Sequence, residues 1–171
     1  MIKHEVTYNG IIEFEIENKT KKHELQASWK RSVMVLFEGE ICEYYQWFIN
    51  RRYSLPLKKP LRRMHCSLIN DRFTDVKGET LEDKEKLWNE VKNKYNGQSI
   101  DVTLNLDMQI VKNYWFFDLN EQSKLDLQAI RQELGLGLPY YDFHCTVGIV
   151  NEINKPHHDY IKRLLDKGLI S

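Results

Sequence analysis

Two short segments of the sequence place the same chemically useful residues at the same spacing. His65 is followed two positions later by Ser67, and His144 is followed two positions later by Thr146. Each pair lies in an apolar run typical of a strand, and side chains in a strand alternate between its two faces. We therefore expect the imidazole and the hydroxyl of each segment to lie side by side on one face.

These four residues could together cleave a phosphodiester without a metal ion. A neutral imidazole can act as a general base and a protonated one as a general acid, since the unperturbed pKa of histidine lies near neutrality. The two hydroxyls can donate hydrogen bonds to the non-bridging oxygens, where negative charge builds up in the transition state. The sequence does not say which histidine is the base and which is the acid.

The context of the two motifs distinguishes them from chance matches. By composition alone, the histidines of this chain should give about half of one match to His-x-Ser/Thr. Both motifs also have a cysteine at the middle position, Cys66 in the first and Cys145 in the second. Small thiols are usually buried, so we expect both cysteines to be buried and unreactive beneath the face that carries the histidines. Two surface histidines without a catalytic role are the alternative.

The motif pair resembles the signature of the 2H phosphoesterase superfamily, the LigT-like group. That group includes RNA 2′,3′-cyclic phosphodiesterases, 2′-5′ phosphodiesterases and phage enzymes that destroy cyclic oligonucleotide signals. The order of expected elements from about Ser32 to the C-terminus is also similar, whereas the first 30 residues match nothing in that pattern. Ser67 stands where threonine is commoner, but it keeps the hydroxyl. The resemblance implies a metal-independent phosphodiesterase with four catalytic residues: His65, Ser67, His144 and Thr146.

The resemblance also implies a two-lobed α+β fold, in which antiparallel sheets form a concave cleft and helices lie on the outside. Each lobe would contribute one histidine strand. The chain has 171 residues, enough for one domain with a substantial core, and no linker or repeat divides it. We therefore expect a single domain over residues 1–171, with residues 1–30 as an N-terminal hairpin extension.

Hydrophobic periodicity predicts the elements that would hold the two motif strands. Residues 6–17 alternate and predict a hairpin with its turn at Asn9-Gly10. A turn at Asp107 would join two further strands. Strands outside the motifs are expected at 32–37, 100–106 and 109–118. Helical spacing and capping residues predict helices at 40–52, 79–95, 120–134 and 156–168.

A basic segment precedes the first motif. Residues 51–63 contain six basic residues and no acidic one. Guanidinium groups bind oxyanions in a fork, so Arg62 and Arg63 are candidates to contact a substrate phosphate. Arg63 would share the face of His65 if the strand extended that far back. A solvated basic loop is an equally reasonable interpretation.

Aromatic residues could hold a nucleobase near the motifs. Tyr114, Trp115 and Tyr141 are the candidates, because base–aromatic stacking is common in proteins that bind single-stranded nucleic acid. Aromatic residues on strands are more often core residues, which is the alternative for the first two. Asp142 lies two residues before His144 and could orient its ring or only form a turn.

Other kinds of site find less support in the sequence. The adjacent pair His157-His158 cannot converge on one metal from a helix turn, and we expect both residues to be exposed at a helix N-terminus. No HExxH motif, zinc-type cluster or glycine-rich phosphate loop is present, so we expect neither metal nor cofactor. A non-catalytic nucleotide- or RNA-binding module on the same fold is the alternative function. Two intact histidine–hydroxyl pairs favour the enzyme.

Composition limits the partners that we expect. Twenty-five basic and twenty-five acidic residues cancel, whereas a protein that coats nucleic acid would be basic. We therefore expect a small nucleotide or single-stranded RNA as substrate: an RNA end, a 2′-5′ oligonucleotide or a cyclic oligonucleotide signal of antiphage defence. The apolar runs are too short to span a membrane, and the N-terminus lacks a signal-peptide core. Three cysteines without metal-binding spacing indicate reduced thiols, and hence a cytoplasmic protein, which we expect to be a monomer.

Overall fold

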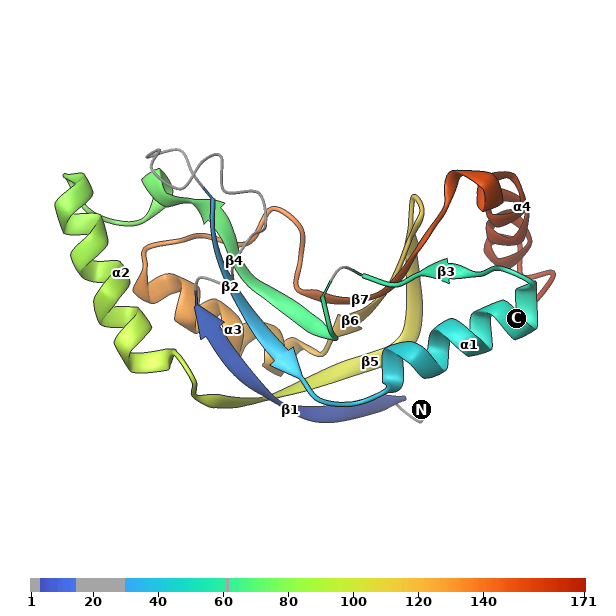
Figure 1. The fold of residues 1–171 in the computed structure, drawn as a ribbon, viewed down its shortest axis with the longest axis horizontal. Helices are drawn as coiled ribbons and strands as arrows, with labels where there is room; N and C mark the ends of the chain where they lie inside the picture. The colour runs from blue at the N-terminus through green and yellow to red at the C-terminus, as the bar shows by residue number, and fades with distance from the viewer. Residues whose placement is uncertain (1–3, 15–29, 61) are drawn as a thin grey trace.

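The computed structural model describes residues 4–14, 30–60 and 62–171 (Figure 1). Within these ranges the chain is mixed α+β, as expected. Its strands are β1 (Glu5–Phe14), β2 (Lys30–Phe37), β3 (Leu57–Lys58), β4 (His65–Arg72), β5 (Ser99–Val111), β6 (Tyr114–Leu119) and β7 (His144–Val150). Its α-helices are α1 (Ile41–Tyr53), α2 (Leu81–Tyr95), α3 (Glu121–Glu133) and α4 (Lys155–Asp166). Short 3₁₀ turns, η2 (Phe73–Asp75) and η3 (Glu152–Asn154), complete the elements.

The described strands form one antiparallel sheet rather than the separate sheets that we expected. The strand order is β3-β7-β4-β2-β1-β5-β6, and β7 also pairs with β6. Six of the strands therefore close into a barrel, while the short β3 lies beside β7. The single sheet arises because β7 forms pairs along both of its edges.

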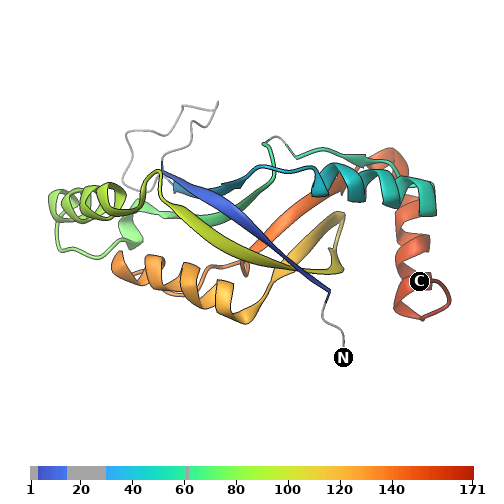
Figure 2. The ribbon, with the colours of Figure 1, turned by 90° about the horizontal axis from the view of Figure 1, so that it is seen from below.

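The helices lie at the two ends of the strands, which places the motif strands between them. Figures 1 and 2 both show α2 and α3 at one end and α1 and α4 at the other. Strands β4 and β7 meet in the central part of the molecule, where Cys66 pairs with Cys145. The motif strands are therefore held by the sheet itself and not by loops at its rim.

The predicted N-terminal hairpin is wrong. β1 runs without a turn through Asn9-Gly10 and lies inside the sheet between β2 and β5, so it is not an extension of the fold. Gly10 pairs with Phe37, and a Cβ added to it would lie 2.8 Å from Phe37 Cε1. The glycine therefore serves close packing and not a turn. Residues 15–17 of the predicted hairpin lie outside the described residues.

The predicted turn at Asp107 is also wrong. β5 continues through Asp107 to Val111, with an irregularity in its pairing to β6 between Asn105 and Gln109. The reversal occurs at Lys112, whose φ is 53°. An irregularity of this kind adds residues to one strand without ending it, so a polar residue there imitates a turn in the sequence.

The other predicted elements are confirmed, with bounds that differ by one or two residues. The strand at 32–37 is the main part of β2, and the four predicted helices correspond to α1–α4. Thr80 caps α2 in a capping box with Asp83, and the Asn120 side chain accepts a hydrogen bond from the Ser123 N–H at the start of α3. No helix within the described ranges is long and apolar enough to cross a membrane.

The cysteines of both motifs lie in the core, as predicted. Cys66 and Cys145 are each 0% exposed, and neither forms a disulfide. Burial raises the pKa of the Cys66 thiol to about 12. Its interaction with Cys42 and its burial raise the pKa of the Cys145 thiol as well. The register from which we placed the histidines on the opposite face is therefore correct.

Candidate active site

The site is built on the contact between β4 and β7. These strands run antiparallel, and their matched pair is Cys66 with Cys145. Both cysteine side chains point into the core, so the residues on either side of each cysteine share the opposite face. The four residues of the two histidine–hydroxyl pairs occupy these positions, and all four are half-buried.

The antiparallel register arranges the four groups as a square. Continued by one residue in each direction, the register of the cysteine pair places His65 opposite Thr146 and Ser67 opposite His144. The two histidines are then diagonal neighbours, which in an antiparallel pair are about 7–8 Å apart. Strand positions at that separation allow both imidazoles to reach one tetrahedral phosphate above the β4–β7 contact.

The two imidazoles are held by the same kind of hydrogen bond to the backbone. His65 Nδ1 lies 2.8 Å from the Arg63 carbonyl oxygen, and His144 Nδ1 lies 2.8 Å from the Asp142 carbonyl oxygen. A carbonyl oxygen can only accept a hydrogen bond, so Nδ1 of each ring carries the proton and donates. Nε2 is then the atom of each ring that takes up or releases a proton.

The surroundings of His65 favour its neutral form. Burial lowers the pKa of His65 below its ordinary value, and the positive charges of Arg62 and of a protonated His144 act in the same direction. The hydrogen bond to the Arg63 carbonyl opposes these effects without reversing them. A ring that is neutral at pH 7 can accept a proton, as a general base must.

His144 has charged and aromatic neighbours instead. Asp118 on β6 is its cross-strand partner, and the Phe116 ring lies edge-on at 5.2 Å between centroids. Lys124 of α3 binds both nearby carboxylates, at 3.0 Å from Asp118 and 2.7 Å from Asp142. The lysine ties the loop before β7 to strand β6. Nothing in the local sequence pattern marks Lys124, because its partners are brought together only by the fold.

Asp142 holds His144 through its backbone and not through its carboxylate. One carboxylate oxygen accepts a hydrogen bond from the Phe143 N–H at 2.8 Å, and the other binds Lys124. The carbonyl oxygen is the atom that contacts the ring. The hypothesis that the Asp142 carboxylate orients the ring is therefore corrected to a backbone contact.

Helix α1 covers the edge of β7 beside the site. β4 pairs with β7 at one residue pair, and β3 pairs with the far end of the same edge. Between them, Cys42 Sγ lies 3.7 Å from the Thr146 carbonyl oxygen, and Gln46 donates a 2.7 Å hydrogen bond to the Val147 carbonyl oxygen. Side chains of α1 thus replace a neighbouring strand where β4 and β3 leave the edge open.

The basic residues before β4 border a pocket next to the site. The pocket has a volume of about 230 Å³, and Arg62, Arg63 and Thr146 are among its lining residues. β4 begins at His65, so Arg63 lies in the preceding bend and not on the strand. The strand does not extend back to Arg63, so Arg63 does not share a strand face with His65, but the pocket brings it to the same site.

Trp115 is not available for stacking on a nucleobase in this structure. It is 3% exposed and lies between Tyr53, at 6.1 Å, and His158, at 6.0 Å between ring centroids. The prediction that Trp115 stacks on a base is therefore corrected: Trp115 is a core residue between β6 and α4. His158 is likewise 1% exposed, so the prediction that both adjacent histidines are exposed is wrong for this one. His157 is exposed and contacts the Tyr53 carbonyl oxygen.

The two candidate tyrosines lie at different places relative to the site. Tyr114 is half exposed and pairs with Ile149, near the end of β7 away from His144. Tyr141 is 73% exposed, packs edge-on against Tyr140 and stands three residues before His144. Tyr141 is therefore the aromatic candidate that the chain brings closest to the second motif.

In the described part of the chain, no three histidine, cysteine or acidic side chains gather in a group that could hold a metal ion. Comparison of the chain with protein-family models, with curated proteins and with solved structures gives no significant match. The resemblance to the 2H superfamily consequently rests on the two motifs and on the order of the elements.

Proposed function

We propose that this chain is a metal-independent phosphodiesterase that acts on a small nucleotide or an RNA end. The observation that carries the proposal is the square of two imidazoles and two hydroxyls on adjacent strands, with both rings in the same tautomer. General acid–base catalysis by two histidines needs this arrangement, since each must reach one side of a single phosphate.

In the proposed reaction His65 is the base and His144 is the acid. Nε2 of His65 takes a proton from water when the substrate is a 2′,3′-cyclic phosphate. When an internal linkage is cleaved, it takes the proton from the free ribose hydroxyl beside that linkage, which is the 2′-hydroxyl for a 3′-5′ linkage and the 3′-hydroxyl for a 2′-5′ linkage. The nucleophilic oxygen forms a bond to phosphorus as the bond to the leaving oxygen breaks. Nε2 of a protonated His144 gives its proton to that leaving oxygen. The lowered pKa of His65 supports this assignment, because the base must be neutral.

Ser67 and Thr146 are the proposed donors to the non-bridging oxygens. Each hydroxyl stands opposite one of the two rings, so both can face the same phosphate from the sides. Hydrogen bonds to these oxygens strengthen as negative charge develops, which lowers the barrier more than the ground-state energy. The proposed substrates are RNA 2′,3′-cyclic ends, 2′-5′ oligonucleotides and cyclic oligonucleotide signals. Action on the last would suit a phage counter-defence enzyme, by analogy with the 2H group.

A substrate panel in EDTA tests the proposal. Nucleoside 2′,3′-cyclic phosphates, 2′-5′ oligoadenylates and cyclic dinucleotides are incubated with the protein, and the products are separated by chromatography. We expect turnover of at least one class in chelator, with loss of turnover in His65→Ala. Binding without turnover of any class would make the protein a nucleotide-binding module. Turnover only after a divalent ion is restored would contradict the metal-independent reaction.

A further inference from the structure

We propose that the pocket beside Thr146 binds a second phosphate group of the substrate. The inference rests on the proposed function, since the second phosphate belongs to the same substrate as the scissile phosphate. It names the substrate class more narrowly: a dinucleotide or a longer chain, linear or closed, rather than a mononucleoside cyclic phosphate.

The position of the pocket connects it to the site. Thr146 belongs to the square of catalytic groups and also lines the pocket. On the other side, the pocket is bounded by the bend before β4 and by Glu43 and Gln46 of α1. A phosphate held between the histidines would therefore have its next neighbour along a nucleotide chain within reach of this pocket.

The charge of the pocket favours an anion. Lys59, Arg62 and Arg63 contribute three cationic side chains, and Glu43 contributes one carboxylate, which leaves an excess of two positive charges. The whole chain is neutral, so this excess is a local feature. Lysine and arginine are the residues that bind phosphate oxygens most strongly, through charge-assisted hydrogen bonds.

The size and lining of the pocket fit a phosphate better than a base. Pockets for complete small-molecule ligands commonly measure about 300–1,000 Å³, and this one, at about 230 Å³, is smaller. Its described lining residues include no aromatic ring on which a base could stack. Gln46 is already engaged with the Val147 carbonyl oxygen and so holds the wall of the pocket in place.

Substrates that share the scissile bond but differ in one charge test the pocket. Adenosine 2′,3′-cyclic phosphate is compared with a dinucleotide that ends in the same cyclic phosphate, and with that dinucleotide carrying an uncharged methylphosphonate at its internal linkage. We expect kcat/KM to be about ten-fold higher or more with the internal phosphate than with the methylphosphonate. Lys59→Met should reduce this preference about three-fold, and Lys59→Glu should abolish it.

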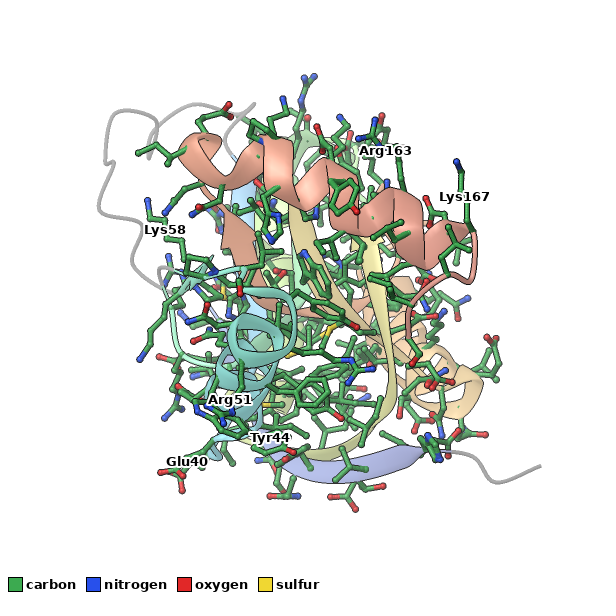
Figure 3. All side chains as sticks on the ribbon, turned by 90° about the vertical axis from the view of Figure 1, so that its right-hand side faces the viewer. Glu40, Tyr44, Arg51, Lys58, Arg163 and Lys167 are labelled. Carbon is green, nitrogen blue, oxygen red and sulfur yellow. The ribbon has the colours of Figure 1, made fainter. Side chains whose placement is uncertain are left out.

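Lys58→Met is the matched control variant. Lys58 lies on β3 and is the chain neighbour of Lys59. It is exposed at the outer edge of the molecule in Figure 3, and it does not line the pocket. Its substitution should leave the preference for the internal phosphate unchanged. Equal kcat/KM values for the phosphate and methylphosphonate dinucleotides would overturn the pocket proposal, as would a preference that survives Lys59→Glu. If nothing is cleaved, the proposed function fails, and calorimetric binding of the same two dinucleotides still decides whether the pocket takes a phosphate.

Discussion

The two histidine strands are alike along the chain but differ across the sheet. Along each strand, a ring bonds the carbonyl oxygen two residues earlier, and a buried cysteine and a hydroxyl follow. With the register of the Cys66–Cys145 pair continued by one residue each way, the positions across β2, β4, β7 and β6 form two rows: Leu36–His65–Thr146–Phe116 and Met34–Ser67–His144–Asp118. His65 thus stands between an apolar side chain and a hydroxyl, whereas His144 stands between a hydroxyl and a carboxylate.

This difference supports the different roles that we propose for two similar motifs. The shared backbone hydrogen bond fixes the tautomer and leaves Nε2 of both rings for proton transfer. The neighbours of the two rings then differ. Burial beside an apolar partner and the positive charge of Arg62 lower the pKa of His65, which suits a base. The cross-strand partner of His144 is instead the carboxylate Asp118, which Lys124 binds together with Asp142.

The largest expected effect comes from removing either ring. His65→Ala and His144→Ala should each lower kcat by about 10²–10⁴, the usual contribution of one general acid or base. The kcat of the double variant should be little lower than that of the slower single variant, because the two groups act in one proton-transfer step. Single-turnover rates in EDTA measure these losses. Nearly full turnover in either single variant would remove that histidine from the mechanism.

Removing a hydroxyl should have a somewhat smaller effect. Ser67→Ala and Thr146→Ala should each lower kcat by about 10²–10³, the range found when one donor to a developing oxyanion is lost. KM should change much less than kcat, since the donors act mainly in the transition state. Thr146→Ser keeps the hydroxyl and is the matched control. If Thr146→Ser were as slow as Thr146→Ala, lost packing against α1 would be the explanation rather than a lost donor.

A change at Lys124 should move the pH dependence rather than abolish activity. In Lys124→Met the carboxylates of Asp118 and Asp142 lose their partner, which leaves two uncompensated negative charges beside His144. The alkaline limb of the pH–rate profile should therefore move upward by roughly half a unit to one unit. Lys124→Arg should restore the parent profile, and the exposed Lys167→Met serves as a control for lost charge. A uniform loss at every pH would indicate a structural role alone.

The smallest effect is expected at the buried thiols. Cys66 and Cys145 should react slowly with a thiol reagent in the native protein, because both are inaccessible and burial raises the pKa of Cys66 to about 12. Labelling should become fast only in denaturant, which a time course read by mass spectrometry can follow. Rapid native labelling of either thiol would contradict the register on which the square of catalytic groups depends.

The sequence predicts what depends on neighbours in the chain. The alternation His65–Cys66–Ser67 is a property of one strand, so it gives the faces correctly before the partner strand is known. The cap at Asn120 is local as well, and α3 begins after it as expected, whereas α2 begins after a cap at Thr80, two residues later than predicted. The central part of the candidate site was therefore predictable without tertiary information.

What the sequence predicts wrongly depends on distant partners. Asn9-Gly10 imitates a hairpin turn, but β1 continues because two long strands pair with it on either side. Trp115 is buried by α4, which follows it by some forty residues in the chain. Lys124 and the pocket beside Thr146 arise only when helices dock on the strands, so no local spacing could indicate them.

The pH dependence of kcat/KM in EDTA tests the division of labour between the two histidines most directly. The parent should give a bell-shaped profile, since one group must be neutral and the other protonated. Because the pKa of His65 is lowered, its acid limb should lie below the ordinary histidine value of 6.5. His65→Ala should lose only the acid limb, and His144→Ala should lose only the alkaline limb. If either variant kept both limbs, that histidine would not be the titrating catalyst, and the proposed mechanism would be wrong.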